Sequence, residues 1–323
     1  MQMKAMQKIT AVMSVCILIP WLITIAVTGV VKREISDVGQ DVKRVRIDVG
    51  KTVMEISVDD YIAGVLASRL SYGEEIELLK AEAVMIRTEV YAAMGDGICI
   101  EDDELSMTYL SDKERRKLWG SEYDEKESLV EDCISSVSNL AIQYEGSFIH
   151  CPYMAVSSGR TRDGSNNGSG TLNYLKSVEC SGDMQADNFL CVFTRSNDDF
   201  VRLCNKKFNS STVGTDTGIS RNAPLESVQI VSRDAADYVN KVKVGSVIVA
   251  GEELADALGL ASPCFYFDNA KEQDGTQCIR ITVKGSGSGY GLSLNEAGRM
   301  ASDGKNYEEI LKYFYSGITI TDV

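Results

Sequence analysis

The sequence predicts a mixed α+β domain that follows an apolar N-terminal segment. Residues 57–95 carry apolar side chains at helical spacing in two stretches, which predicts a pair of helices. Residues 140–159 and 264–281 alternate apolar and polar side chains, as half-buried strands do. With 44% hydrophobic residues in a chain of 323, there is enough apolar material for a sizeable core, in one large domain or two modest ones.

The N-terminal segment is expected to cross a membrane. Residues 9–31 are 23 residues without a charge, and Lys4, Lys8, Lys32 and Arg33 flank them. A cleaved signal peptide is the alternative, but its apolar core is about 7–15 residues long, and no Ala-x-Ala site follows. We therefore expect an N-terminal tail and transmembrane anchor over residues 1–33, a stalk over 34–44 and the folded domain over 45–323, and the basic residues at both ends leave the orientation open.

The part of the chain after the apolar segment is strongly acidic. Residues 1–33 hold four of the 33 Lys and Arg residues and no acidic one, which leaves 29 basic against 47 acidic residues, a net charge of −18. Affinity for a nucleic-acid backbone comes mainly from Lys and Arg, so we expect no nucleic-acid partner. A neutral glycan is still a compatible ligand.

The pair of helices is the clearest element. Ser57, followed by Asp60 three residues later, is typical of a helix start, and the first helix is expected to end near Leu70. After a turn at residues 71–73, Glu74 and Glu75 open the second helix at the positive end of its dipole, and Gly95 ends it.

The rest of the chain divides into shorter elements. Helices are predicted over 111–120 and 124–140, a hairpin turns at Glu145-Gly146, and a strand over 246–250 lies between helices over 232–242 and 252–260. The glycines of residues 285–291 lack the strand, helix and Lys-Ser of a nucleotide-binding loop, so they indicate a close-packed turn.

Cysteine and histidine usage predicts disulfides and no metal site. Nine cysteines favour an oxidising compartment, and Cys264 with Cys278, which flank a hairpin, are the best candidates for a bridge. Cys180 and Cys191 are the next candidates, and buried free thiols are the alternative for both pairs. His150 and Cys151 are adjacent on a strand and point to opposite faces, so we expect no metal and no cofactor.

Three separated segments carry motifs of a known family. The first is YIAGVLASRLSYG followed by LLKAEAVMIRTEVYA, the second is the loop SSGRT with the later YLKSV, and the third is the glycine-rich C-terminal segment. Together they resemble the stage II sporulation protein D family, whose members are membrane-anchored lytic transglycosylases acting on peptidoglycan. The positions in register include Tyr61, Gly64, Val65, Leu79, Lys80, Ala81, Ala83, Arg87, Thr88, Ser157, Ser158, Gly159, Gly287, Gly289, Gly291, Met300, Gly304, Lys305, Tyr307 and Tyr315.

The resemblance fails at the positions that carry the chemistry. A lytic transglycosylase needs a carboxylic acid that protonates the glycosidic oxygen and then, as carboxylate, helps the C6 hydroxyl close on the anomeric carbon. The family's acid position holds Arg69, which cannot exchange a proton on demand. Its His and Gln positions hold Ser288 and Leu294. We therefore assign no catalytic residue.

The nearest carboxylates are poor replacements. Glu74 and Glu75 start one helix, Asp59 and Asp60 start the other, and a helix N-terminus stabilises the charged form, which is the wrong direction for a general acid.

The resemblance also implies the residues that bind substrate. They are Arg87, Tyr174, Lys176, Arg160 and Thr161. The alternatives are a buried structural Arg87 paired with Glu82 or Glu89, and a Tyr174 on an exposed strand edge.

Together, the pattern and the resemblance predict helices packed on a curved, mostly antiparallel sheet with a groove between them. They predict a protein that binds peptidoglycan glycan strands with lost or altered lytic activity, held by its N-terminal helix in the cell membrane with the large domain outside the cytoplasm. An active lytic transglycosylase and a protein-interaction module that contacts sporulation membrane proteins are the alternatives.

Overall fold

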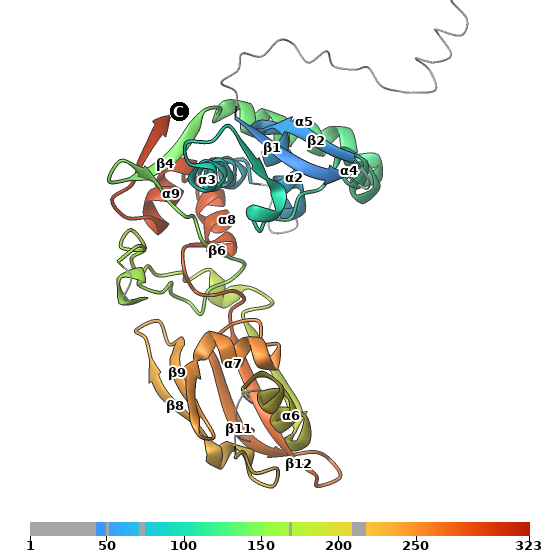
Figure 1. Cartoon of the computed structure of the whole chain (residues 1–323), viewed down its shortest axis with the longest axis vertical. Coiled ribbons are helices and arrows are strands. Elements are labelled where there is room, and N and C mark those ends of the chain that lie inside the picture. The colour runs from blue at the N-terminus through green and yellow to red at the C-terminus, as the bar shows by residue number, and fades with distance from the viewer. Residues whose placement is uncertain (1–42, 50–51, 71–74, 168–169, 209–217) are drawn as a thin grey trace, which may run out of the picture. The chain divides into compact units, whose positions relative to one another are not determined.

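The structure is a computed structural model (Figure 1). It describes residues 43–49, 52–70, 75–167, 170–208 and 218–323. The predicted transmembrane helix over residues 9–31 lies outside this part of the chain. No helix among the described residues combines the length and the apolar composition that crossing a bilayer requires. The fold class predicted from the sequence, which included such a helix, is therefore corrected to α+β alone.

The pair of helices is confirmed and forms the centre of the first hydrophobic core. Helix α2 is Val58–Arg69 and helix α3 is Ile76–Met94. Ser57 caps α2 by accepting a hydrogen bond from the backbone N–H of Asp60, at 3.0 Å. Helix α3 is buried on most of its surface because it contacts α2, α5, α8, α9 and strand β4 (Figure 1). A helix with apolar residues on most faces is stable only when other elements cover it.

Of the other helices, α4, α5 and α7 lie where helices were predicted. Helices α4, α5, α7, α8 and α9 are Asp112–Trp119, Tyr123–Ser136, Gly251–Leu258, Leu294–Ser302 and Tyr307–Phe314, and α6 is Asn197–Phe208. The helix predicted over residues 232–242 was wrong. Asp234 accepts hydrogen bonds from the backbone N–H groups of Ala236 and Tyr238, and this turn, with Asp237 at φ +71°, reverses the chain between two strands.

The prediction of one curved sheet was also wrong, because the described strands form five small sheets. The first two are β2-β1-β3 (Thr52–Ser57, Arg44–Val49, Cys99–Glu101) and β14-β4-β5 (Thr319–Asp322, Leu140–Tyr144, Ser147–Phe148). The third is the parallel pair β13-β6 (Leu292–Ser293, Tyr153–Met154). The last two are β10-β9-β8 (Val247–Ala250, Val239–Val244, Val228–Arg233) and β11-β12-β7 (Phe265–Lys271, Gln277–Lys284, Leu190–Ser196).

The last two sheets share a second hydrophobic core with helices α6 and α7. Its buried side chains include Phe200, Val242, Leu254 and Ile279. The first core holds the side chains of α2, α3, α5, α8 and α9. The described residues therefore form two large apolar cores, with a small third cluster of Ala236, Tyr238 and Cys264.

The predicted hairpin at residues 264–281 is confirmed, but the disulfide across it is not. In strands β11 and β12, Cys278 lies opposite Ala270, whereas Cys264 precedes Phe265, which lies opposite Val283. The two cysteines are thus at opposite ends of the hairpin. Each cysteine among the described residues, Cys180 and Cys191 included, is a free thiol.

The glycine-rich segment is the close-packed turn that the sequence predicted. Gly287 and Gly291 have φ angles of +122° and +79°, which L-residues rarely adopt. A Cβ atom on Gly287 would lie 2.4 Å from the Cβ of Met154, and one on Gly291 would lie 1.7 Å from the carbonyl oxygen of Pro152. The turn therefore packs closely against Pro152 and Met154, at the end of the stretch over residues 150–153 that forms one wall of the site described next.

Candidate functional site

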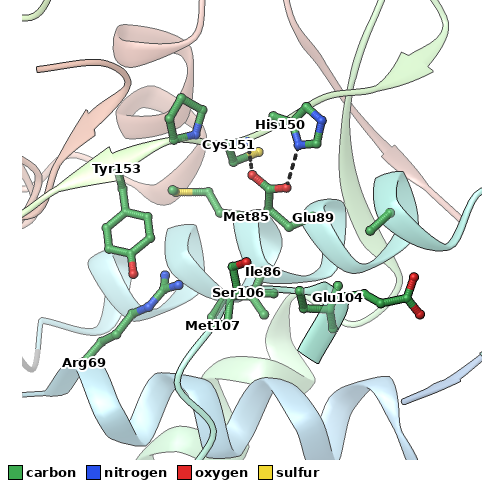
Figure 2. A pocket seen from close by; sticks show the side chains of 13 residues that line it. Arg69, Met85, Ile86, Glu89, Glu104, Ser106, Met107, His150, Cys151 and Tyr153 are labelled. Atoms are coloured by element: carbon green, nitrogen blue, oxygen red, sulfur yellow. Dashed lines mark hydrogen bonds and ion pairs between the residues drawn. The ribbon is translucent and has the colours of Figure 1, made fainter. Parts of the chain in front are cut away.

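The candidate site is a cavity of about 400 Å³ beside the middle of helix α3 (Figure 2). Four segments form its walls: the end of α2, one face of α3, the loop over residues 104–107 and the stretch over residues 150–153. The lining side chains are Arg69, Met85, Ile86, Glu89, Ala93, Glu104, Leu105, Ser106, Met107, His150, Cys151, Pro152 and Tyr153.

Arg69 supplies the cation of this cavity. Its guanidinium carbon lies 4.0 Å from the centre of the Tyr153 ring, and its Nη1 lies 3.5 Å from Oε1 of Glu82. Only 6% of the Arg69 side chain and 1% of the Glu82 side chain is exposed. Burial raises the pKa of the Glu82 carboxyl to about 7, although the Arg69 guanidinium opposes this shift. Glu82 lies behind Arg69 and is not part of the cavity lining.

Glu89 and His150 form a second polar group on the wall. Glu89 Oε2 lies 3.0 Å from Nδ1 of His150, and its Oε1 accepts a hydrogen bond from the backbone N–H of Cys151 (Figure 2). The His150 side chain is 74% exposed, whereas Cys151 is buried. Neither residue lies in a strand, so the prediction that placed both on one was wrong. The Tyr174 hydroxyl donates to the carbonyl oxygen of His150 at 2.8 Å and holds this stretch from behind.

Residues 48–144, which include three of the four walls, match the model of a family described as stage II sporulation protein. The chain carries a stage II sporulation protein domain. Stage II sporulation protein D of Bacillus amyloliquefaciens is 27% identical to it over 279 residues, which cover 84% of this chain and 76% of that protein. Stage II sporulation protein D of Bacillus subtilis is 26% identical over 281 residues, with the same shares covered.

A third relative is the amidase enhancer of Bacillus subtilis, which is 23% identical over 298 residues, covering 80% of this chain and 40% of that protein. The resemblance predicted from the three motifs is thereby confirmed. Over most of its length the chain is similar to stage II sporulation protein D, and it is also similar to the amidase enhancer.

In this stage II sporulation protein D-like chain, Arg87 lies away from the cavity lining. It is 1% exposed, and its guanidinium donates to the carbonyl oxygens of Val137 at 2.8 Å and Leu140 at 3.1 Å and to Asp59 at 2.7 Å. The structure thus shows a buried Arg, but its partner is Asp59 rather than Glu82 or Glu89. Substrate binding by Arg87 stays a prediction.

Tyr174 is buried as well, with 3% of its surface exposed. Its ring lies 5.6 Å from that of Tyr144 and 6.5 Å from that of Tyr315, centre to centre. The alternative of an exposed strand edge was therefore wrong. Burial raises the pKa of the Tyr174 hydroxyl, so this group donates its hydrogen bond to His150 at all physiological pH values.

The remaining predicted binding residues gather in one loop, outside the cavity lining. Lys176 Nζ lies 3.9 Å from Asp163, and its carbonyl oxygen accepts a hydrogen bond from the buried Thr161 hydroxyl. Arg160 forms an exposed ion pair with Glu179 at 2.6 Å. These contacts hold the loop together, and substrate binding by its side chains stays a prediction.

The carboxylates that were weighed as replacement acids lie elsewhere. Asp59 pairs with Arg87, Asp60 accepts from the Ser57 hydroxyl, and Glu75 accepts from the Ser302 hydroxyl at 3.2 Å. Glu74 lies outside the described residues. None of the three described carboxylates lines the cavity.

Among the described residues, no three His, Cys, Asp or Glu side chains lie close enough together to hold a metal ion. The absence of a metal and of a cofactor stays a prediction.

Sequence reasoning missed the cavity residues Glu89 and Tyr153 and the buried Glu82. Glu82, Met85, Ile86 and Glu89 recur at helical spacing, so the sequence could have indicated that both carboxylates lie near one face of α3. Nothing in the sequence shows that Tyr153, 84 positions later than Arg69, completes that site.

Proposed function

We propose that this protein binds peptidoglycan glycan strands in the cavity beside α3 and that lytic cleavage by the family's usual acid is lost. One observation carries the proposal: the position where the family resemblance implies the acid holds Arg69, a buried cation in a cavity wall, paired with Glu82. Since a guanidinium stays protonated, it can bind a ligand but cannot protonate a leaving oxygen and recover the proton.

The cavity has the chemistry of a sugar site. Its volume of about 400 Å³ lies within the range of roughly 300–1,000 Å³ that ligand pockets occupy. The Tyr153 ring, which is 40% exposed, offers a flat apolar surface, and His150 and Arg69 offer hydrogen-bond donors. Because peptidoglycan lies outside the cytoplasm, the proposal places the folded domain there.

The test is a pelleting assay of the purified full chain with insoluble peptidoglycan, combined with mass spectrometry of the soluble fraction. Binding without release of 1,6-anhydro sugars is the expected result. Release of anhydro products would contradict the loss of activity. Neither binding nor release would leave the predicted alternative, a module that contacts other proteins of the sporulation machinery.

A second function, lytic transglycosylation with a relocated acid, is favoured by Glu89, a carboxylate that lines the cavity. In that case a protonated Glu89 would donate to the glycosidic oxygen, the C6 hydroxyl would attack the anomeric carbon, and its proton would return to Glu89. The expected result is that E89Q abolishes anhydro products while binding persists. E104Q is the matched control, since Glu104 lines the same cavity and caps its own loop by accepting from the backbone N–H of Glu101.

A further inference from the structure

The Arg69 guanidinium is held so that part of it faces the cavity. Glu82 contacts Nη1 from one side at 3.5 Å, and the Tyr153 ring covers one face of the group at 4.0 Å. Figure 2 shows the guanidinium pointing from the end of α2 toward Tyr153 across the cavity. A guanidinium carries five N–H donors, and among the described residues only Glu82 accepts from it. Donors are therefore left for a ligand.

The carboxylates on the cavity wall do not satisfy these donors. Glu89 is held by His150 and by the backbone of Cys151, at the other end of the cavity floor (Figure 2). Glu104 accepts from the backbone N–H of Glu101, and its carboxylate points away from Arg69 in Figure 2. Arg69 is thus a nearly buried cation whose single ion-pair partner lies behind it.

We propose that the cavity binds a carboxylate of its ligand through the Arg69 guanidinium. The inference rests on the proposed glycan-binding function and names the group by which the ligand is recognised. A planar guanidinium matches a carboxylate with two parallel hydrogen bonds, and stacking on Tyr153 fixes the plane in which they form. An ionised carboxylate at the same position would repel such a ligand, so Arg69 changes what the cavity selects.

Peptidoglycan offers this chemistry from two sources. One is the lactyl carboxylate of muramic acid, which is free only where no stem peptide is attached, and the other is a carboxylate of the stem peptide itself. Both would form the same paired hydrogen bonds with Arg69, so the experiment has to separate them.

The experiment is calorimetric titration of the purified full chain with three ligands: a peptide-free glycan oligomer, the same oligomer with its carboxylates methylated, and the isolated stem peptide. The expected result is that one carboxylate-bearing ligand binds about tenfold or more tightly than the methylated oligomer. Preference for the free glycan assigns the sugar as the source, and competition by the stem peptide assigns the peptide.

The variants test Arg69 itself. Arg69→Gln combined with Glu82→Gln removes both charges of the pair, so no buried charge is left without a partner, and it should remove the preference for the free acid. Arg69→Lys should keep only part of it, because an ammonium cannot form the paired bonds. Arg116→Gln is the matched control: Arg116 also stacks on a tyrosine ring at 4.0 Å and pairs with a carboxylate, but it lies on α4, outside the cavity lining.

Two outcomes would overturn the inference, and only the second of them also contradicts glycan binding. If the free and methylated oligomers bind equally well, and the Arg69 variants bind as the unmodified chain does, the carboxylate site is wrong and glycan binding stands. If no glycan binds the unmodified chain in titration or in the pelleting assay, the proposed function fails and this inference fails with it.

Discussion

Two buried arginines, Arg69 at the end of α2 and Arg162 in the loop after strand β6, differ in how many hydrogen bonds they make within the chain. Arg162 donates to Asp234 at 2.7 Å, to Asn240 at 2.8 Å, to Glu252 and to the carbonyl oxygen of Ser288 at 3.2 Å. Arg69, which is buried to the same degree, has one carboxylate partner at 3.5 Å among the described residues.

This difference in hydrogen bonding distinguishes a structural arginine from one that can bind a ligand. A guanidinium such as that of Arg162, with four of its five donors used by its own chain, fixes elements relative to each other and has little left for a ligand. A guanidinium that is buried but only partly used can improve its hydrogen bonding when a ligand arrives.

Replacing Arg162 should have the largest effect on stability. Arg162→Met leaves Asp234, whose side chain is 10% exposed, without its ion-pair partner, and breaking a buried pair costs about 3–5 kcal/mol. The free energy of unfolding from urea titration measures this loss. Arg160→Gln is the control, because the exposed pair with Glu179 should contribute less than about 1 kcal/mol. Equal effects of the two variants would contradict the contrast.

The Arg69–Glu82 pair should instead make the free energy of unfolding depend on pH. Burial raises the pKa of Glu82 from 4.5 to about 7, so between these values the folded chain holds a proton that the unfolded chain has released. The stability contributed by Glu82 is therefore full below about pH 4.5 and falls as the pH rises through 7. E82Q does not titrate, so its stability relative to the unmodified chain should rise by roughly 3 kcal/mol from pH 4.5 to 8.

Urea titrations of both proteins at several pH values measure this difference. The other charged groups near the cavity are the same in both proteins, so the comparison isolates the effect of residue 82. A difference in stability that stays constant from pH 4.5 to 8 would show that Glu82 is ionised throughout.

Replacing Arg87 should also lower the free energy of unfolding, but by less than replacing Arg162. Arg87→Lys keeps the charge near Asp59 but cannot reach the carbonyl oxygens of Val137 and Leu140 as well, so we expect a loss of about 2 kcal/mol in unfolding free energy. Glycan pelleting by the folded variant should be unchanged. Weaker pelleting with unchanged stability would instead support the predicted role of Arg87 in substrate binding.

Local signals predicted the local structure well. The Ser57 cap, the Glu145-Gly146 turn and the apolar stripes of α3 and α5 each depend on residues close in sequence, and each was found. The helix predicted over residues 232–242 failed because the Asp234 side chain bonds to the backbone ahead of it and competes with helix formation.

The candidate site is formed by contacts between residues far apart in the sequence, which no local sequence pattern predicts. Glu89 meets His150 across 61 positions and Arg69 meets Tyr153 across 84, through the packing of α2, α3 and the stretch before β6. The family motifs singled out position 69, and Arg69 lies in the wall of the cavity. They could not show that Glu82 stands behind it, or that Arg87 and Tyr174 would be enclosed by the core.

The glycine-rich turn has a consequence for how this protein could change. A side chain at Gly287 or Gly291 would collide with Met154 or Pro152, so these glycines set how the turn packs against the stretch over residues 150–153. The atoms in these close contacts belong to Met154 and Pro152, so substitutions at positions 150 and 153 leave the contacts themselves unchanged. Such an arrangement lets a lineage, or a protein engineer, replace one ligand preference by another through single substitutions while the scaffold stays as it is.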